Sequence, residues 1–176
     1  MRWISFVILA YLVLAMQLAA GGLLRFGTAS PNLVLPFVIF IAINARREEA
    51  LAGTLILGLL HDLISQQPPG FHAFCYGLVG LFAVGTQPAV YRDHPLTHLF
   101  VTLAAGLLVG AITVLNQWVL HHTQRMPEPL FWGALSSAIY TALLAPLLLF
   151  PLTRIKTLFA FRPARLYALE ERRSRR

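Results

Sequence analysis

The fold of this chain is decided by the stretch Leu55-Ile56-Leu57-Gly58-Leu59-Leu60-His61-Asp62-Leu63-Ile64. Its residues are apolar or small except for His61 and the carboxylate Asp62, which stands well inside the apolar run. A charged side chain at the centre of a membrane helix costs on the order of 2.5–3.5 kcal/mol to insert. Ionisable groups in such segments mark candidate functional sites, and Asp62 is the first candidate here.

The composition indicates a membrane protein. The 176 residues are 57% hydrophobic and 12% charged, whereas a typical soluble domain is about 25% charged. The apolar residues form six blocks with short connections, which are Trp3 to Leu24, Leu33 to Ile43, Ala50 to Ile64, Phe71 to Val90, Leu96 to Leu120 and Leu130 to Leu152. The sequence therefore predicts an all-α integral membrane protein, with six transmembrane helices in one compact bundle over residues 1–153 and a basic cytoplasmic tail over residues 154–176.

Two of the blocks need comment. The first block is longer than the roughly 7–15 apolar residues of a signal peptide, and further spans follow, so we expect it to be retained. In the second, Ser30 and Pro31 resemble a helix start, with a capping residue followed by proline at the first helical position. A helix from Pro31 to Asn44 covers only about 21 Å, against a hydrocarbon core of ~30 Å.

The distribution of basic residues supports six spans. If both termini are cytoplasmic, every Lys and Arg except Arg25 and Arg125 falls on the cytoplasmic side, as the positive-inside rule requires. The tail is basic and also apolar, so we expect it to contact anionic lipids or a cytoplasmic protein rather than nucleic acid. The tail residues assigned to this contact are Arg154, Lys156, Arg162 and Arg165.

Small residues form stripes on three of the predicted helices. Ala50, Thr54, Gly58 and Asp62 recur at every fourth position and so share one helical face. Small residues let membrane helices approach closely, so this face either binds a partner helix or packs inside the bundle. Similar rows that we expect to seat neighbouring helices are Gly70, Gly77 and Gly80 in the fourth block and Thr102, Gly106 and Gly110 in the fifth.

Polar side chains recur at the predicted depth of Asp62, in the outer half of the bilayer. They are Gln17, Asn32, His61, His72 and Asn116, with Gln117 beside the last. They form either one polar cluster beneath the outer surface or separate markers of helix ends at the interface. Depth follows from the sequence, but the direction of each side chain around its helix does not.

The sequence contains little evidence for a catalytic site. His94 and His98 have metal-ligand spacing, but Pro95 places His94 before a helix and no third ligand is near in sequence. An intramembrane hydrolase would need Asp62, His72 and Ser136 or Ser137, and no hydrolase motif surrounds them. The single cysteine, Cys75, lies in an apolar segment, and we expect its side chain to be buried as a small apolar group. We expect neither an enzyme nor a cofactor or metal site.

Three motifs occur in order along the chain. They are Ser30-Pro31-Asn32-Leu33-Val34-Leu35, then Gly58-Leu59-Leu60-His61-Asp62-Leu63-Ile64-Ser65 with Gly70 beyond, and finally Pro127-Glu128 before Phe131-Trp132. In this set, and in its length and basic tail, the chain resembles the family of the rod shape-determining protein MreD. It departs from the family pattern at Pro68-Pro69 and at Gly53, which stands five residues before Gly58 rather than four.

The resemblance implies a function without catalysis. Family members are similar in fold to the six-helix substrate-binding subunits of vitamin transporters. They belong to the bacterial cell-elongation complex, associate with the bitopic protein MreC and, through it, with the actin-like MreB filament and a glycosyltransferase and transpeptidase pair that makes peptidoglycan. We therefore expect a membrane scaffold of the bacterial inner membrane. The alternative is a small-molecule-binding subunit of a membrane transporter, with the polar cluster as its pocket.

Overall fold

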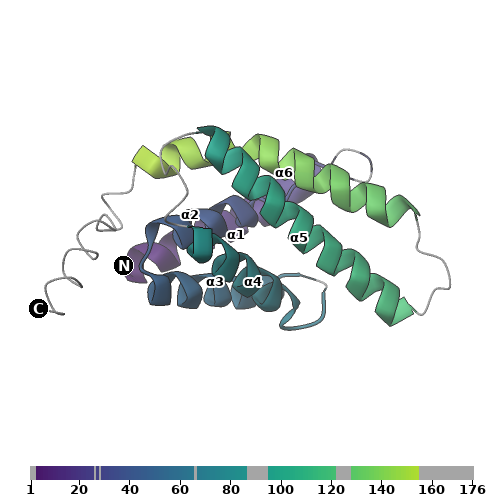
Figure 1. Ribbon diagram of the computed structural model, residues 1–176, viewed down its shortest axis with the longest axis horizontal. Coiled ribbons are helices and arrows are strands. Elements are labelled where there is room, and N and C mark those ends of the chain that lie inside the picture. The colour runs from purple at the N-terminus through teal and green to yellow at the C-terminus, as the bar shows by residue number, and fades with distance from the viewer. Residues whose placement is uncertain are drawn as a thin grey trace, which may run out of the picture.

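The computed structural model describes residues 3–25, 27, 29–65, 67–86, 95–121 and 128–154. These residues form six α-helices in one bundle (Figure 1). The helices are α1 (Trp3–Leu23), α2 (Val34–Asn44), α3 (Arg47–Asp62), α4 (Phe71–Thr86), α5 (Pro95–His121) and α6 (Glu128–Arg154). They follow the six predicted blocks in number and order, and the predicted tail beyond Arg154 lies outside the described residues.

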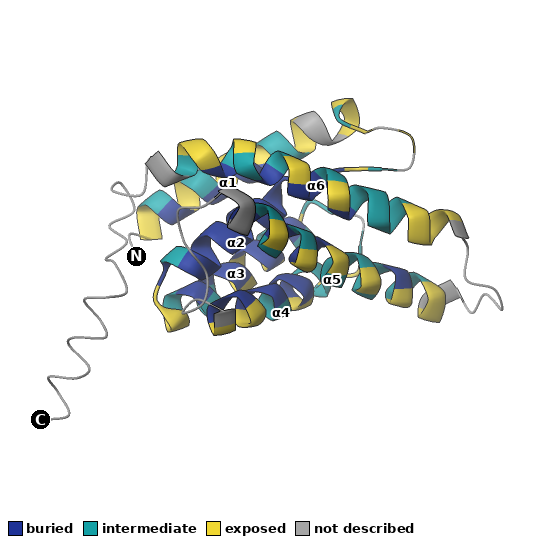
Figure 2. Cartoon of the chain, turned by 45° about the horizontal axis from the view of Figure 1, so that its top comes forward, coloured by how far each residue is buried: buried dark blue, intermediate teal, exposed yellow. Residues whose placement is uncertain are grey.

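The short helix α2 is the centre of the bundle. Every residue from Val34 to Ile43 is buried, and α2 packs against each of the other five helices. Figure 2 shows it as a continuous dark blue core element, with the exposed residues of the other helices turned outward. A helix that is apolar all round is stable only when it is enclosed on all sides, and here the other five helices enclose it.

The predicted start of this helix is wrong. Helix α2 begins at Val34, three residues after Pro31. The backbone before it is held by side chains of other helices, because Ser30 N donates to Ser137 Oγ and Asn32 N donates to Thr141 Oγ1. These bonds replace the helical turn that a capping Ser30 would have begun.

The second segment therefore combines a non-helical part with a short helix. Leu33 N also donates to Gln17 Oε1 at 2.7 Å, which ties the non-helical part to α1. Residues 30–32, before the αR residue Leu33, add at most about 10 Å to the roughly 16 Å of α2, which brings the segment nearer to the ~30 Å of a bilayer core. Non-helical backbone at membrane depth is tolerated where protein satisfies its polar groups, as it does here.

The outer surface of the bundle is consistent with a lipid environment. Within the described residues, His98–Val119 of α5 and Pro129–Leu152 of α6 are long and apolar enough to cross a membrane. Large apolar side chains face outward on several helices, including Ile4 (78% exposed), Tyr11 (76%) and Leu147 (72%). A soluble protein rarely exposes apolar surface of this extent.

The helix ends lie in two groups, one at each end of the bundle. The start of α1 and the end of α6 lie at the same end of the bundle (Figure 1). The opposite end gathers the ends of α1, α3 and α5 with the starts of α2, α4 and α6. The predicted polar residues lie at this second end, and the cytoplasmic position of the termini stays a prediction.

Candidate functional site: a capped helix, a polar network and a cavity

Asp62, the last residue of α3, caps the start of α4. Its Oδ2 atom accepts hydrogen bonds from the backbone N–H groups of Gly70 (3.0 Å) and Ala73 (3.1 Å). Its Oδ1 atom accepts from the backbone N–H of His72 at 2.8 Å and lies 2.9 Å from His72 Nδ1. The first N–H groups of a helix have no partner within the helix, and a carboxylate also complements the helix dipole there. The carboxylate of α3 therefore supplies the N-terminal cap of α4.

The turn between α3 and α4 allows this contact. Gly70 directly precedes α4 with φ +91°, a left-handed conformation that a residue with a Cβ adopts only with strain. Gly70 thus belongs to the turn, and the prediction that it thins one side of the fourth helix is wrong. The departure of Pro68-Pro69 from the family pattern lies in the same turn, where Phe71 N donates to Pro68 O.

The small-residue stripe of α3 packs on α4 inside the chain. A Cβ on Gly58 would lie 2.6 Å from the carbonyl oxygen of His72 and 2.7 Å from the backbone nitrogen of Ala73, which is too close for any side chain. Thr54 is fully buried and faces Gly80, while Gly77 faces Leu55. Of the two readings left open for this stripe, the structure shows packing within the bundle.

The second small-residue row joins α5 to α6. A Cβ on Gly106 would lie 3.2 Å from Ala138 Cα, and one on Gly110 would lie 3.3 Å from Ala134 Cβ. Because the glycines face alanines, the two helices approach closely along this seam. Thr102, the first member of the row, is buried and donates its hydroxyl to the carbonyl of His98.

Two of the predicted polar residues, Asn32 and His61, form a hydrogen-bonded network with Tyr76. The Tyr76 hydroxyl lies 2.7 Å from His61 Nδ1 and exchanges hydrogen bonds with the side chain of Asn32 at 3.0 and 3.2 Å. Asn32 Oδ1 also accepts from the backbone N–H groups of Val34 and Leu35 at the start of α2. The His61 ring lies 4.1 Å, centroid to centroid, from the ring of His72.

Gln17 of α1 holds the backbone on both sides of Asn32. Its amide accepts from Leu33 N and donates to Pro31 O at 3.4 Å. Polar groups from α1, α2, α3 and α4 are therefore held together at one end of the bundle. Such a network fixes the relative positions of the helix ends, because each buried polar group would be costly to leave unpaired.

Of the predicted pair Asn116 and Gln117, Gln117 lines the cavity described below. One residue of the site was missed at the level of the sequence. Tyr76 was not singled out, although it stands four residues after His72 and hence on the same face of α4. The four-residue spacing from His72 is the feature of the sequence that could have identified Tyr76.

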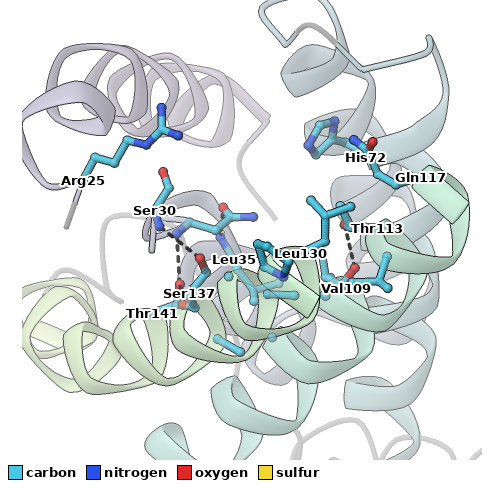
Figure 3. A pocket seen from close by; sticks show the side chains of 18 residues that line it. Arg25, Ser30, Leu35, His72, Val109, Thr113, Gln117, Leu130, Ser137 and Thr141 are labelled. Atoms are coloured by element: carbon cyan, nitrogen blue, oxygen red, sulfur yellow. Dashed lines mark hydrogen bonds between the residues drawn. The ribbon is translucent and has the colours of Figure 1, made fainter. Parts of the chain in front are cut away.

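A cavity of about 420 Å³ lies between the polar network and the pair α5 and α6. Figure 3 shows Arg25 and Ser30 on one side of it and His72 and Gln117 across from them. Its polar lining residues are Arg25, Ser30, Asn32, His72, Thr113, Gln117, Ser137 and Thr141, and its apolar ones include Leu35, Val109, Val114 and Leu130. The volume suits a small ligand or a lipid head group.

The remaining predicted residues fall elsewhere. Within the described part of the chain, no three His, Cys, Asp or Glu side chains are grouped to hold a metal ion. Cys75 is buried. Helix α6 ends at Arg154, while the side chain of Arg154 and the residues Lys156, Arg162, Arg165 and His94 lie outside what the structure describes.

Comparison with protein families identifies the chain. The family model described as rod shape-determining protein MreD matches residues 1–155. Comparisons with curated proteins and with solved structures returned no match, so the similarity to vitamin-transporter subunits stays a prediction. The family match spans all six helices, including the capped α4 and the polar network around Tyr76. The chain belongs to the MreD family of rod shape-determining proteins.

Proposed function

We propose that this chain is a non-catalytic, multi-pass scaffold of the bacterial inner membrane, within the complex that elongates the peptidoglycan wall. In this proposal it binds an MreC-type bitopic protein through the membrane. It is thereby connected to the MreB filament on the cytoplasmic side and to the wall-building glycosyltransferase and transpeptidase on the other side. The family assignment gives the role in rod shape, and the following observations support a scaffold.

The observation that carries the proposal is the fixed arrangement of helix ends. Asp62 joins α3 to α4, and Tyr76 joins α4 to both α2 and α3. Ser137 and Thr141 of α6 hold the segment before α2. A bundle whose helices are connected in this way presents its outer faces in constant positions, which is what a scaffold requires.

The inner small-residue faces are already occupied, so a partner must use the outer faces. Helix α1 offers a large uncovered apolar surface, since only Phe6, Ala10, Val13 and Leu14 of its described hydrophobic residues are buried. Ile4, Ile8 and Tyr11 recur along one outer face of α1 and are all exposed. Membrane helices associate by packing such faces against each other.

Site-specific photocrosslinking in native membranes tests this function. A photoreactive amino acid at Ile8 or Tyr11 is expected to capture the MreC-type bitopic protein. The same probe at Leu147, on the outer face of α6, serves as the matched exposed control. Failure of the full chain to co-purify with any bitopic partner, together with normal rod shape after its deletion, would overturn the proposal.

The cavity favours a second candidate, the small-molecule-binding subunit of a transporter. Its fold would then be similar to that of the vitamin-transporter subunits, with Asn32, His72 and Gln117 recognising a water-soluble ligand. The test is mass spectrometry of small molecules released from the purified chain. A stoichiometric water-soluble ligand would support this candidate, and its absence would oppose it.

A further inference from the structure

The cavity combines a polar mouth with a mixed lining farther along α5 and α6. Arg25, Ser30, His72 and Gln117 surround the mouth, at the end of the bundle that gathers the polar network. Farther along the two helices the lining includes the apolar Val109 and Ala138 beside the hydroxyl of Thr141. A site with both kinds of lining matches a ligand that is itself polar at one end and apolar at the other.

The charge at the mouth is positive. Among the lining residues that the structure describes, Arg25 carries the single formal positive charge and none is a carboxylate. Asp62 lies nearby, but its two oxygens are used by Gly70, His72 and Ala73, and its side chain is only 5% exposed. An anionic group at the mouth would therefore meet the Arg25 guanidinium without an opposing charge, and guanidinium groups bind phosphate through paired hydrogen bonds.

The depth of the cavity corresponds to one leaflet of a bilayer. Along α5 it extends from Gly106 to Gln117, which is about 16 Å of helix. Half of a ~30 Å hydrocarbon core is about 15 Å. A lipid with its phosphate at the level of Arg25 would thus have its chains beside the apolar part of the lining.

Helices α5 and α6 form one side of the cavity. The two helices approach closely at Gly106 and Gly110 and diverge toward the end of α5 and the start of α6 (Figures 1 and 2). A second cavity of about 520 Å³, almost entirely apolar, lies along this seam and shares Gly110, Val114 and Ala134 with the first. The shared residues place the polar cavity and the apolar one on the two sides of one helix pair.

We propose that the cavity binds a membrane amphiphile, with a phosphate-bearing head group at Arg25 and a hydrocarbon chain beside the apolar lining residues of α5 and α6. His72 contributes its ring to the head-group end. Its Nδ1 atom is engaged by Asp62, and no hydrogen bond of its Nε2 atom occurs within the described residues, so Nε2 is available to the ligand. This site is separate from the outer faces assigned to protein partners.

Native mass spectrometry of the full chain in zwitterionic detergent provides the test. The chain is titrated with phosphatidylglycerol, with diacylglycerol of the same acyl chains, which lacks the phosphate, and with glycerol 3-phosphate. We expect one phosphatidylglycerol to be retained at about tenfold lower concentration than diacylglycerol, the ratio given by one charge-assisted contact. Equal retention of the two lipids, or binding of glycerol 3-phosphate as tight as that of phosphatidylglycerol, overturns the proposal.

Charge variants locate the site. Arg25→Glu is expected to abolish the preference for phosphatidylglycerol, while Arg25→Lys retains it. The matched control is Arg47→Glu, an equally exposed cation at the start of α3 and the other end of the bundle. Loss of the preference in Arg47→Glu, or its persistence in Arg25→Glu, assigns the binding to general surface charge and overturns the proposal.

A substitution that fills the cavity provides an independent test of the proposal. The hydroxyl of Thr113 bonds only within its own helix, to the carbonyl of Val109, so replacing it removes no contact between helices. Thr113→Phe is expected to reduce phosphatidylglycerol retention at least tenfold, whereas Thr113→Val keeps the volume and the binding. Unchanged retention in Thr113→Phe contradicts the assignment to this cavity.

Discussion

The hydroxyl of Tyr76 lies 2.7 Å from Nδ1 of His61, and both side chains are buried between α3 and α4. The same hydroxyl exchanges hydrogen bonds with Asn32 at the start of α2. One phenolic oxygen thus connects three helices in the interior of the bundle. This arrangement makes Tyr76 the residue whose chemistry most strongly sets the relative positions of α2, α3 and α4.

Replacement of Tyr76 by Phe is expected to destabilise the protein by about 1–3 kcal/mol, because it leaves the buried His61 and the half-buried Asn32 without their shared partner. Reversible unfolding in mixed detergent micelles measures the free energy of unfolding. The control is Tyr11→Phe, which removes a hydroxyl from an exposed position on α1 and should leave the free energy unchanged. Equal stability of Tyr76→Phe and wild type would show that the network contributes nothing.

The coupling between Tyr76 and Asn32 can be measured directly. Asn32→Ala removes the acceptor for the first N–H groups of α2 and the partner of Tyr76. Combined with Tyr76→Phe, it should cost less than the sum of the two single changes, with a coupling of about 0.5–3 kcal/mol. Strict additivity in the double-mutant cycle would contradict a shared network.

Asp62→Leu is expected to release the start of α4. Loss of the carboxylate leaves three backbone N–H groups without an acceptor, at a cost of about 1.5–3 kcal/mol. Hydrogen exchange should accelerate at the amides of Gly70, His72 and Ala73 while α5 stays protected. Asp62→Asn keeps one acceptor oxygen and should fall between wild type and Asp62→Leu.

Two further readouts test whether the cap matters to the cell. If Asp62 supports the bundle, Asp62→Leu should lower the membrane level of the protein and its binding to the bitopic partner. Normal levels, normal binding and unchanged amide exchange in Asp62→Leu would leave the structural role of Asp62 without support.

A methyl group at Gly58 is expected to separate α3 from α4. Gly58→Ala introduces a Cβ against the backbone of His72 and Ala73, which cannot move aside as a flexible side chain can. The expected loss of stability is about 1–3 kcal/mol. Gly85→Ala is the matched control, since a Cβ there meets nothing within 4 Å, and it should be neutral or stabilising by up to about 1 kcal/mol. Similar effects of the two variants would argue against close packing at Gly58.

The order of the helices was predictable because the lengths of the apolar blocks and the polar loops between them follow directly from the amino-acid sequence. The contact of the Thr54 and Gly58 face with another helix was likewise foreseen from the spacing of small residues. The choice between a partner helix and α4 was not, since any close helix satisfies the same pattern. It depended on the tight turn at Gly70, which brings Ala73 opposite Gly58.

The errors have a common physical cause. One residue along a helix turns the side chain by about 100°, so knowledge of depth alone could not distinguish Asn116 from Gln117. The start of α2 was misplaced for a related reason. Its capping pattern at Ser30 and Pro31 is local, but the hydroxyls of Ser137 and Thr141, more than a hundred residues away, determine the backbone there.

The backbone before α2 depends on α6 for two of its hydrogen bonds. During synthesis, residues 30–32 are made long before Ser137 and Thr141. Until then the backbone N–H groups of Ser30 and Asn32 lack their acceptors, and exposed backbone is poorly tolerated in hydrocarbon. The backbone of the second segment is therefore fully hydrogen-bonded only once the sixth helix is present.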